Sequence, residues 1–125
     1  MFGQIEKNSE FAFGLALGMA TTFIYLPTEL QDKIFAIIGR NVRFAYGLGY
    51  GLGFVFNYLP KELQSHVFEV MQQNSESARG IGYGLGYTFS FLDNEFQKAV
   101  FKRVENDFQF AYGLGEGLGL SLIHI

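Results

Sequence analysis

Two histidines, His66 and His124, are the side chains of this sequence best suited to metal binding or proton transfer. A zinc site needs three or four histidine, cysteine or carboxylate ligands, and the chain has no cysteine. In the internal repeat described below, His66 aligns with Lys33 and Ala99, which indicates a solvated position. His124 aligns with aromatic residues, which indicates packing or a helix C-terminus. We therefore expect no metal site and no disulfide.

Three regularly spaced glutamates, Glu29, Glu62 and Glu95, could form a carboxylate array. Each falls in the first turn of a predicted helix, where a carboxylate stabilises the positive end of the helix dipole. We interpret them as helix-terminal charges. No nucleophile, acid or base recurs beside them, so we expect the protein not to be an enzyme.

The glycine runs suggest a phosphate-binding loop at first sight. The pattern G-x-G-x-x-G would need a third glycine where Leu52, Leu85 or Leu118 stands, and G-x-x-x-x-G-K-[ST] does not occur. We expect no cofactor. The 16 glycines have to be explained by packing instead.

The charge of the chain excludes two classes of partner. The net charge is −3 with both signs mixed along the sequence, so we expect no nucleic-acid binding and no attraction to an anionic membrane. Glu6, Lys7 and Glu10 interrupt the start of the chain, which is not the pattern of a signal peptide. The compartment stays open, with the cytoplasm as the default expectation.

A unit of 33 residues repeats along the chain without insertion. Glycines recur at this step at two positions of the unit, first at Gly14 and Gly18, and Asn or Asp recurs from Asn8 onward. The repeat predicts one domain over residues 1–125. Its parts are a partial second helix at 1–7, full repeats at 8–40, 41–73 and 74–106, and a half repeat at 107–125.

The second half of each unit, exemplified by residues 60–73, reads as an amphipathic helix. Leu63, Val67 and Val70 fall at helical spacing. Pro60 suits the first helical position, and Gly39 suits the C-terminal cap of the earlier copy.

The first half of each unit, exemplified by residues 44–59, is ambiguous. Large and small residues alternate from Tyr46 to Phe54, which favours a strand. A length of 16 residues and the preceding Asn or Asp cap favour a helix. On a wheel at about 100° per residue, Gly47 and Gly51 lie opposite Gly49 and Gly53. We predict a helix with two opposed glycine faces, a leucine stripe and a tyrosine stripe.

The glycine run resembles the inner helix of the ATP synthase c subunit, in which G-x-G-x-G-x-G packs helices into a ring. The resemblance covers residues 47–53 and their repeats, and it implies close helix packing alone, because no carboxylate matches the ion-binding position. The 33-residue period also occurs in ankyrin and tetratricopeptide repeats, whose signature residues are not present. We therefore predict an all-α fold, an α-solenoid of stacked helix pairs, with a strand–helix repeat as the alternative.

The repeats differ along the tyrosine stripe. Its first position holds Phe, Tyr, Arg and Tyr in turn, and its second holds Leu, Tyr, Tyr and Glu, a variation that is not typical of a buried core. These side chains either bind a partner or cover backbone exposed by the glycines. We predict that Arg79 and Glu116 lie close together on this stripe. The candidate interaction surface, called the tyrosine face below, is Tyr46, Tyr50, Arg79, Tyr83, Tyr87, Tyr112 and Glu116.

The last glycine-rich segment has no second helix after it, so its leucine stripe would be uncovered. Such a stripe predicts self-association. A two-fold dimer is favoured over a head-to-tail contact with Phe2 and Ile5, and a longer array is a third alternative. The candidate oligomer contact is Leu114, Leu118, Leu122 and Ile125.

These features predict a non-catalytic scaffold that binds a protein or itself. The alternative is a membrane-associated assembly packed through the glycine-rich helices, because residues 11–26 and 44–59 are uncharged and contain G-x-x-x-G spacing. Both segments are shorter than the roughly 20 residues that a membrane span needs.

Overall fold

Every regular element that the structure describes is helical. The structure is a computed structural model that describes residues 9–123, with side chains over residues 14–122. No strand occurs within residues 9–123, so the strand–helix alternative is wrong there and the all-α prediction is confirmed. The glycine-rich helices are α2 (Ser9–Ala20), α4 (Val42–Phe54), α6 (Ser75–Tyr87) and α8 (Phe108–Ile123). The amphipathic helices are α3 (Thr28–Ile37), α5 (Lys61–Met71) and α7 (Asn94–Val104).

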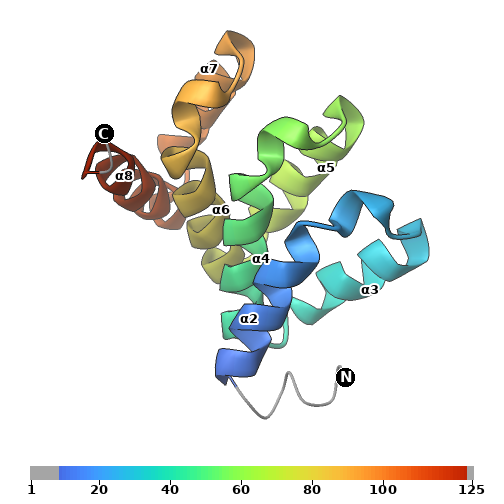
Figure 1. Cartoon of the computed structure of the whole chain (residues 1–125). Helices are drawn as coiled ribbons and strands as arrows, with labels where there is room; N and C mark the ends of the chain where they lie inside the picture. Colours follow the sequence, from blue (N-terminus) through green and yellow to red (C-terminus); the bar gives the residue numbers. More distant parts are fainter. Residues whose placement is uncertain (1–8, 124–125) are drawn as a thin grey trace.

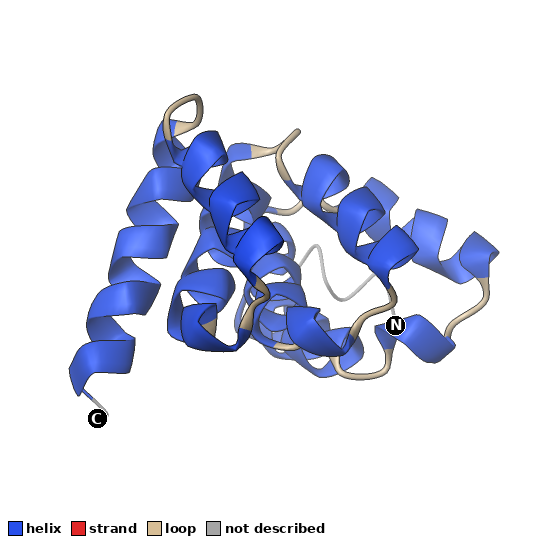
Figure 2. Ribbon diagram, turned by 90° about the horizontal axis from the view of Figure 1, so that it is seen from above, coloured by secondary structure: helices blue, strands red, loops and turns tan. Residues whose placement is uncertain are grey.

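The four glycine-rich helices lie side by side in chain order, and the amphipathic helices spread outward from them (Figure 1). Helix α6 packs against both α4 and α8, and α4 packs against α2. The same all-helical arrangement is seen from above in Figure 2. Glycine-rich helices that follow one another in the chain therefore contact each other, while α2 and α8 lie at the two ends of the row.

The repeated Asn or Asp caps the glycine-rich helices, as predicted. The Asn41 side chain accepts a hydrogen bond from the Phe44 N–H at 2.9 Å, and Asp107 accepts one from the Phe110 N–H at 3.0 Å. Asn74 accepts from the N–H groups of Glu76 and Ser77. Asn74 also donates to the Ile38 carbonyl at 3.2 Å, so this cap ties the third repeat to the first. Asn8 lies outside the described residues.

The glycine-rich helices α4 and α6 end earlier than the sequence suggested. Residues 44–59 were expected to form one helix, but α4 ends at Phe54 and a separate 3-10 helix, η2 (Phe56–Tyr58), follows. Equivalent turns are η1 (Phe23–Tyr25) and η3 (Phe89–Phe91). After each of these helices the backbone forms a 3-10 turn, which directs the chain toward the next amphipathic helix.

A glutamine at the same position of each repeat holds this turn. The Nε2 group of Gln31 donates to the Phe23 carbonyl at 3.0 Å, Gln64 to the Phe56 carbonyl at 2.9 Å, and Gln97 to the Phe89 carbonyl at 3.0 Å. Each of these carbonyl groups also accepts a backbone hydrogen bond within the 3-10 turn, from the N–H of Leu26, Leu59 or Leu92, so the glutamine adds a second donor. The recurrence of glutamine every 33 residues therefore has a structural cause.

Two helix-end predictions need correction. Pro60 has extended backbone (ψ 148°) and stands at the N-cap, so the helix begins one residue later, at Lys61. Gly39 does not adopt the left-handed conformation of a C-terminal cap, since no glycine of the described chain has a positive φ. Helix α3 ends at Ile37, and Ile38 continues with right-handed backbone.

The core lies between the glycine-rich helices and the amphipathic helices. The leucine stripe supplies Leu48, Ile81, Leu52 and Leu85, all fully buried. Aromatic rings from the turns complete it: the Phe56 ring lies 4.5 Å from the Phe96 ring, measured between centroids. The constant leucine-stripe positions of α4 and α6 are thus among those that the fold buries.

We expect Gln97→Ala to lower the free energy of unfolding by about 1 to 2 kcal/mol, because the Leu92 carbonyl loses the glutamine donor and the Phe89 carbonyl keeps only the backbone N–H of Leu92. Urea denaturation followed by circular dichroism measures this. Gln73→Ala, at an exposed position, is the control and should change the midpoint little. Equal midpoints for the two variants would mean that the glutamine does not stabilise the turn.

Candidate interaction surface

Backbone contact between the glycine-rich helices sets the spacing of the side chains on their surface. A Cβ atom at Gly53 would lie 2.7 Å from the Ile81 carbonyl oxygen of α6, and one at Gly84 would lie 2.6 Å from the Phe54 nitrogen of α4. On the other face of α4, a Cβ atom at Gly51 would lie 2.5 Å from the Cβ of Ala20. Glycines on two sides of α4 thus lie against two different helices, α6 and α2. Helices in such close contact bring equivalent side chains of adjacent repeats together.

The tyrosine face consists of rows that cross from helix to helix. In the first row, the Arg79 guanidinium lies 5.6 Å from the centre of the Tyr46 ring and 4.6 Å from that of Tyr112. In the second row, the rings of Tyr50 and Tyr83 lie 4.7 Å apart. A third row joins Phe54 to Tyr87 at 5.5 Å, although Phe54 was not among the predicted residues. Stacking of this kind stabilises the rings in fixed positions.

Arg79 and Glu116 form an ion pair, as the sequence predicted. The Arg79 Nη2 lies 3.2 Å from the Glu116 Oε1, and both side chains are about one-third exposed. Burial lowers the pKa of Arg79, but the Glu116 carboxylate outweighs it, and the net direction is upward. The arginine is therefore held between two rings by an adjacent carboxylate.

We expect the coupling between Arg79 and Glu116 to be about 0 to 1 kcal/mol, because the pair is exposed to solvent. A double-mutant cycle with Arg79→Gln and Glu116→Gln, measured in urea at two salt concentrations, gives this value. The coupling should fall as salt rises. A coupling that is larger and insensitive to salt would show that the pair is shielded from water.

The phenol groups of Tyr46 and Tyr50 are unsuited to acid–base chemistry at neutral pH. Burial is the largest cause that raises the pKa of Tyr46 above its ordinary value, and the nearby Glu116 carboxylate adds to it. Burial also raises the pKa of Tyr50, with Tyr83 and Tyr87 adding to it. Both phenols therefore stay protonated, and their raised pKa values stabilise the fold fully below about pH 10, with loss at higher pH. The face can recognise a partner through rings and hydroxyl groups.

A second row of aromatic residues was missed by the sequence analysis. Tyr25, Tyr58 and Phe91, called the aromatic edge below, are 79%, 80% and 71% exposed. They stand at the same position of successive repeats, each at the end of a 3-10 helix. The repeated aromatic type was visible in the sequence, but a continuous helix would have packed these rings inward. The 3-10 turn directs them to solvent.

Two hollows adjoin these aromatic residues. One, of about 210 Å³, is lined by Phe54, Tyr58, Tyr87 and Phe91 among others. The other, of about 260 Å³, lies on the far side of Phe54, between α2 and α4, and Leu17 and Tyr50 line it. Both are mainly apolar, and the Phe54 ring separates them. The aromatic edge and the tyrosine face thus meet at Phe54.

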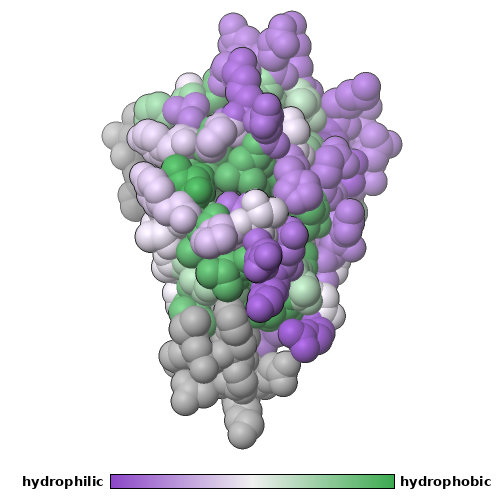
Figure 3. All heavy atoms as spheres, turned by 90° about the vertical axis from the view of Figure 1, so that its right-hand side faces the viewer, coloured by the Kyte–Doolittle hydropathy of each residue, from purple (hydrophilic) through white to green (hydrophobic). Residues whose placement is uncertain are grey.

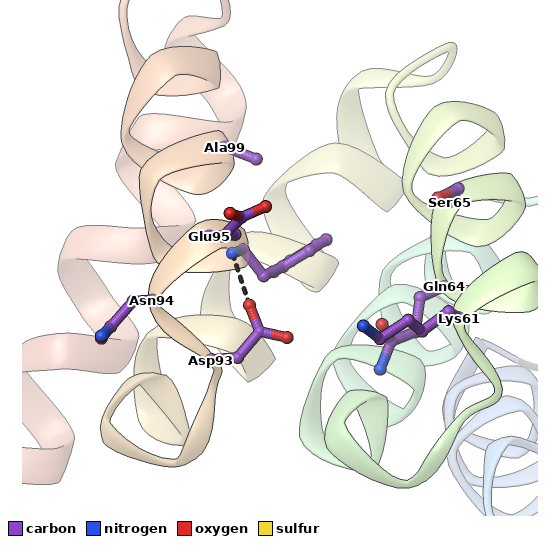
Figure 4. A pocket seen from close by; sticks show the side chains of 8 residues that line it. Lys61, Gln64, Ser65, Asp93, Asn94, Glu95 and Ala99 are labelled. Carbon is purple, nitrogen blue, oxygen red and sulfur yellow. Dashed lines mark hydrogen bonds between the residues drawn. The ribbon is translucent and has the colours of Figure 1, made fainter.

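A polar notch of about 400 Å³ separates α5 from α7. Figure 4 shows Lys61 and Gln64 on one side of it and Asp93 and Glu95 on the other. The Asp93 carboxylate accepts a hydrogen bond from the Phe96 N–H at 2.7 Å, so it caps α7. No group of three or more metal-binding side chains occurs among the residues described. The notch therefore has no feature beyond opposed polar helix faces.

The residues of the predicted oligomer contact differ in how far they are buried. Leu114 is only 3% exposed and belongs to the core, and Leu118 is partly buried against that core. Leu122 is exposed, while Ile125 lies outside the described residues. His124 and the first residues, Phe2 and Ile5, lie outside them too. The open part of the leucine stripe is therefore shorter than four residues within the described chain.

His66 is exposed on α5, where the sequence analysis placed it, and its ring lies 5.6 Å from that of Phe35.

No protein-family model matches this chain, and neither the curated proteins nor the solved structures gave a significant match. Within residues 9–123, none of the helices combines the length and the apolar character needed to cross a membrane.

Proposed function

We propose that this chain is a non-catalytic scaffold, a short α-solenoid that binds an apolar segment of another protein along its aromatic edge. The observation that carries the proposal is the regular exposure of Tyr25, Tyr58 and Phe91, one from each successive repeat. Exposed apolar side chains that occur singly need no explanation, whereas a row of them marks an interaction site.

The solenoid reading is supported by contacts between consecutive repeats. Each glycine-rich helix packs against the next one along the chain, and the caps and turns recur with the same 33-residue step. In a repeat protein of this kind, most contacts are between neighbouring units, and the row of units offers an extended surface. Equivalent side chains are then presented at regular intervals to a partner.

The chemistry of the surface indicates the class of partner. The two hollows on either side of Phe54 are mainly apolar and are each large enough for one side chain. Tyrosine and phenylalanine are enriched at protein interfaces, because large rigid rings bury much area at little entropic cost. A peptide segment with two or three apolar side chains fits this surface better than a small polar ligand.

We favour this function over the membrane-associated assembly. Such an assembly would use the glycine faces to join separate chains in the bilayer, but those of α4 and α6 already contact helices of the same chain. The exposed rings of the aromatic edge, by contrast, are accessible to a partner protein.

Selection from a displayed library of random peptides tests the proposal. We expect the selected peptides to be rich in apolar and aromatic residues, and to bind Tyr58→Ser/Phe91→Ser at least about tenfold more weakly than wild type. Val42→Ser, which removes an exposed apolar side chain elsewhere, is the control and should leave affinity unchanged. Peptides that bind both variants equally well, or a failure to select any, would contradict the proposal.

A further inference from the structure

One end of the row of glycine-rich helices has a glycine face that no described residue contacts. In α4 and α6, the second glycine pair of each helix contacts the next glycine-rich helix; a Cβ atom at Gly82, for example, would lie 3.0 Å from the Leu114 nitrogen. The equivalent pair in α8 is Gly115 and Gly119, and no described atom lies within 4 Å of a Cβ built at either. A shallow hollow of about 360 Å³ follows these two glycines, between Tyr83 and Leu120.

The opposite end of the row has the complementary face. Gly80 and Gly84 of α6 contact the preceding helix, α4. The equivalent residues of α2 are Gly14 and Gly18, and nothing in the described part of the chain lies within 4 Å of a Cβ built there. The two ends of the row therefore carry the two halves of the contact that joins α4 to α6.

An independent sign of the same interface is found in the amphipathic helices. Phe35 and Phe68 are each 9% exposed, because the following repeat covers them; the Phe68 ring lies 5.4 Å from that of Phe96. Phe101 occupies the same position in α7 and is 53% exposed. The residue that corresponds to Phe96 in the first repeat is Leu30, and it too is exposed. Hydrophobic side chains reach the surface between hydrophilic ones on the α3 side of the molecule (Figure 3).

We propose that a second copy of this chain stacks head to tail on the first, with α2 of the second copy against α8 of the first. Gly14 and Gly18 would then meet Gly115 and Gly119 as Gly80 and Gly84 meet α4. Leu30 of the second copy would cover Phe101 as Phe96 covers Phe68. The contact uses the ends of the row and does not depend on the aromatic edge.

The internal contacts favour this arrangement over a two-fold dimer. Along α4, Gly49 lies beside Ile81 and Gly53 lies beside Leu85, so α4 and α6 run parallel. The face of α4 that carries Gly49 and Gly53 meets the face of α6 that carries Gly80 and Gly84, and these two faces are not equivalent. A two-fold axis would pair α8 with α8 and bring like faces together. Head-to-tail stacking reproduces the contact that the fold already forms, and it can continue to a third copy.

Two variants test the proposal, each with the glycine face at one end of the row of helices blocked. Gly115→Leu/Gly119→Leu blocks the α8 face, and Gly14→Leu/Gly18→Leu blocks the α2 face. Both changes add side chains where the described chain leaves open space, so each variant should fold; circular dichroism in dilute solution checks this. Analytical ultracentrifugation should show wild type growing beyond a dimer as concentration rises. Each variant alone should stay near the 14.1 kDa of one chain.

A mixture of the two variants is the decisive measurement. Each keeps one intact face, so the mixture should form a one-to-one dimer that does not grow. Leu122→Ser, which shortens the exposed leucine stripe, should assemble as wild type does. Wild type that stays monomeric at high concentration would overturn the proposal. Dimerisation of the Gly14→Leu/Gly18→Leu variant by itself would overturn it in favour of a two-fold contact through α8.

Discussion

Gly84→Leu is expected to separate α4 from α6 and to lower the free energy of unfolding by about 3 kcal/mol or more, at the upper end of overpacking effects. A Cβ atom at this position would lie 2.6 Å from the Phe54 nitrogen and 2.8 Å from the Gly53 carbonyl carbon, and it would also meet the Tyr50 carbonyl oxygen. These are backbone atoms inside a helix, so no side chain can rotate away. Urea denaturation followed by circular dichroism measures the loss.

The same substitution at the open end of the row is the matched control. Gly115→Leu meets no described atom within 4 Å. It also replaces a poor helix former with a good one, which favours the helix by about 0.5 to 1 kcal/mol. In dilute solution we expect its urea midpoint to equal or exceed that of wild type. A Gly84→Leu midpoint equal to that of Gly115→Leu would refute the close backbone contact between α4 and α6.

Phe56→Ala is expected to cost about 3 to 5 kcal/mol, the range for a large buried ring replaced by alanine. Phe56 is fully buried, and its ring packs on that of Phe96 in the following repeat. Its backbone carbonyl also accepts the hydrogen bond from Gln64, so the cavity would open beside the turn that this bond holds. The change should therefore destabilise two repeats together. Thermal and urea unfolding measure it.

Tyr58→Ala, two residues further in the same 3-10 helix, is the comparison for Phe56→Ala. The Tyr58 ring is largely exposed, so its removal should change stability by no more than about 0.5 kcal/mol. Similar losses for the two variants would mean that the turn does not direct Phe56 inward and Tyr58 outward.

Much of the fold could be predicted from the repeat. The recurrence of Asn41, Asn74 and Asp107 identified the helix starts, because a capping side chain acts on amide groups two or three residues away. The ends of the same helices were not predictable in this way. The turn that follows Phe54 contacts Gln64 and Phe96, which belong to the next two amphipathic helices, so the pattern of the glycine-rich segment alone does not indicate it.

Part of the candidate interaction surface could also be predicted from the repeat. Helical geometry and the repeat step together were sufficient to bring Arg79 and Glu116 into contact. The aromatic edge was missed, because the direction of the Tyr58 side chain is set by the 3-10 helix to which it belongs. Leu114 was expected to be open, but it is buried in the core, and a sequence pattern cannot show which partner covers a stripe.

The contact of glycine with backbone has a consequence for how such a chain can change during evolution. Backbone atoms are the same at every position, so a contact that glycine makes on both sides, as between α4 and α6, does not depend on the side chains of the two helices. An in-frame duplication of residues 41–73 would place the Gly49 and Gly53 face of one copy against the Gly47 and Gly51 face of the next, which is the kind of contact that α4 makes with α6. A further unit could then be added while the joint between α4 and α6 keeps its geometry.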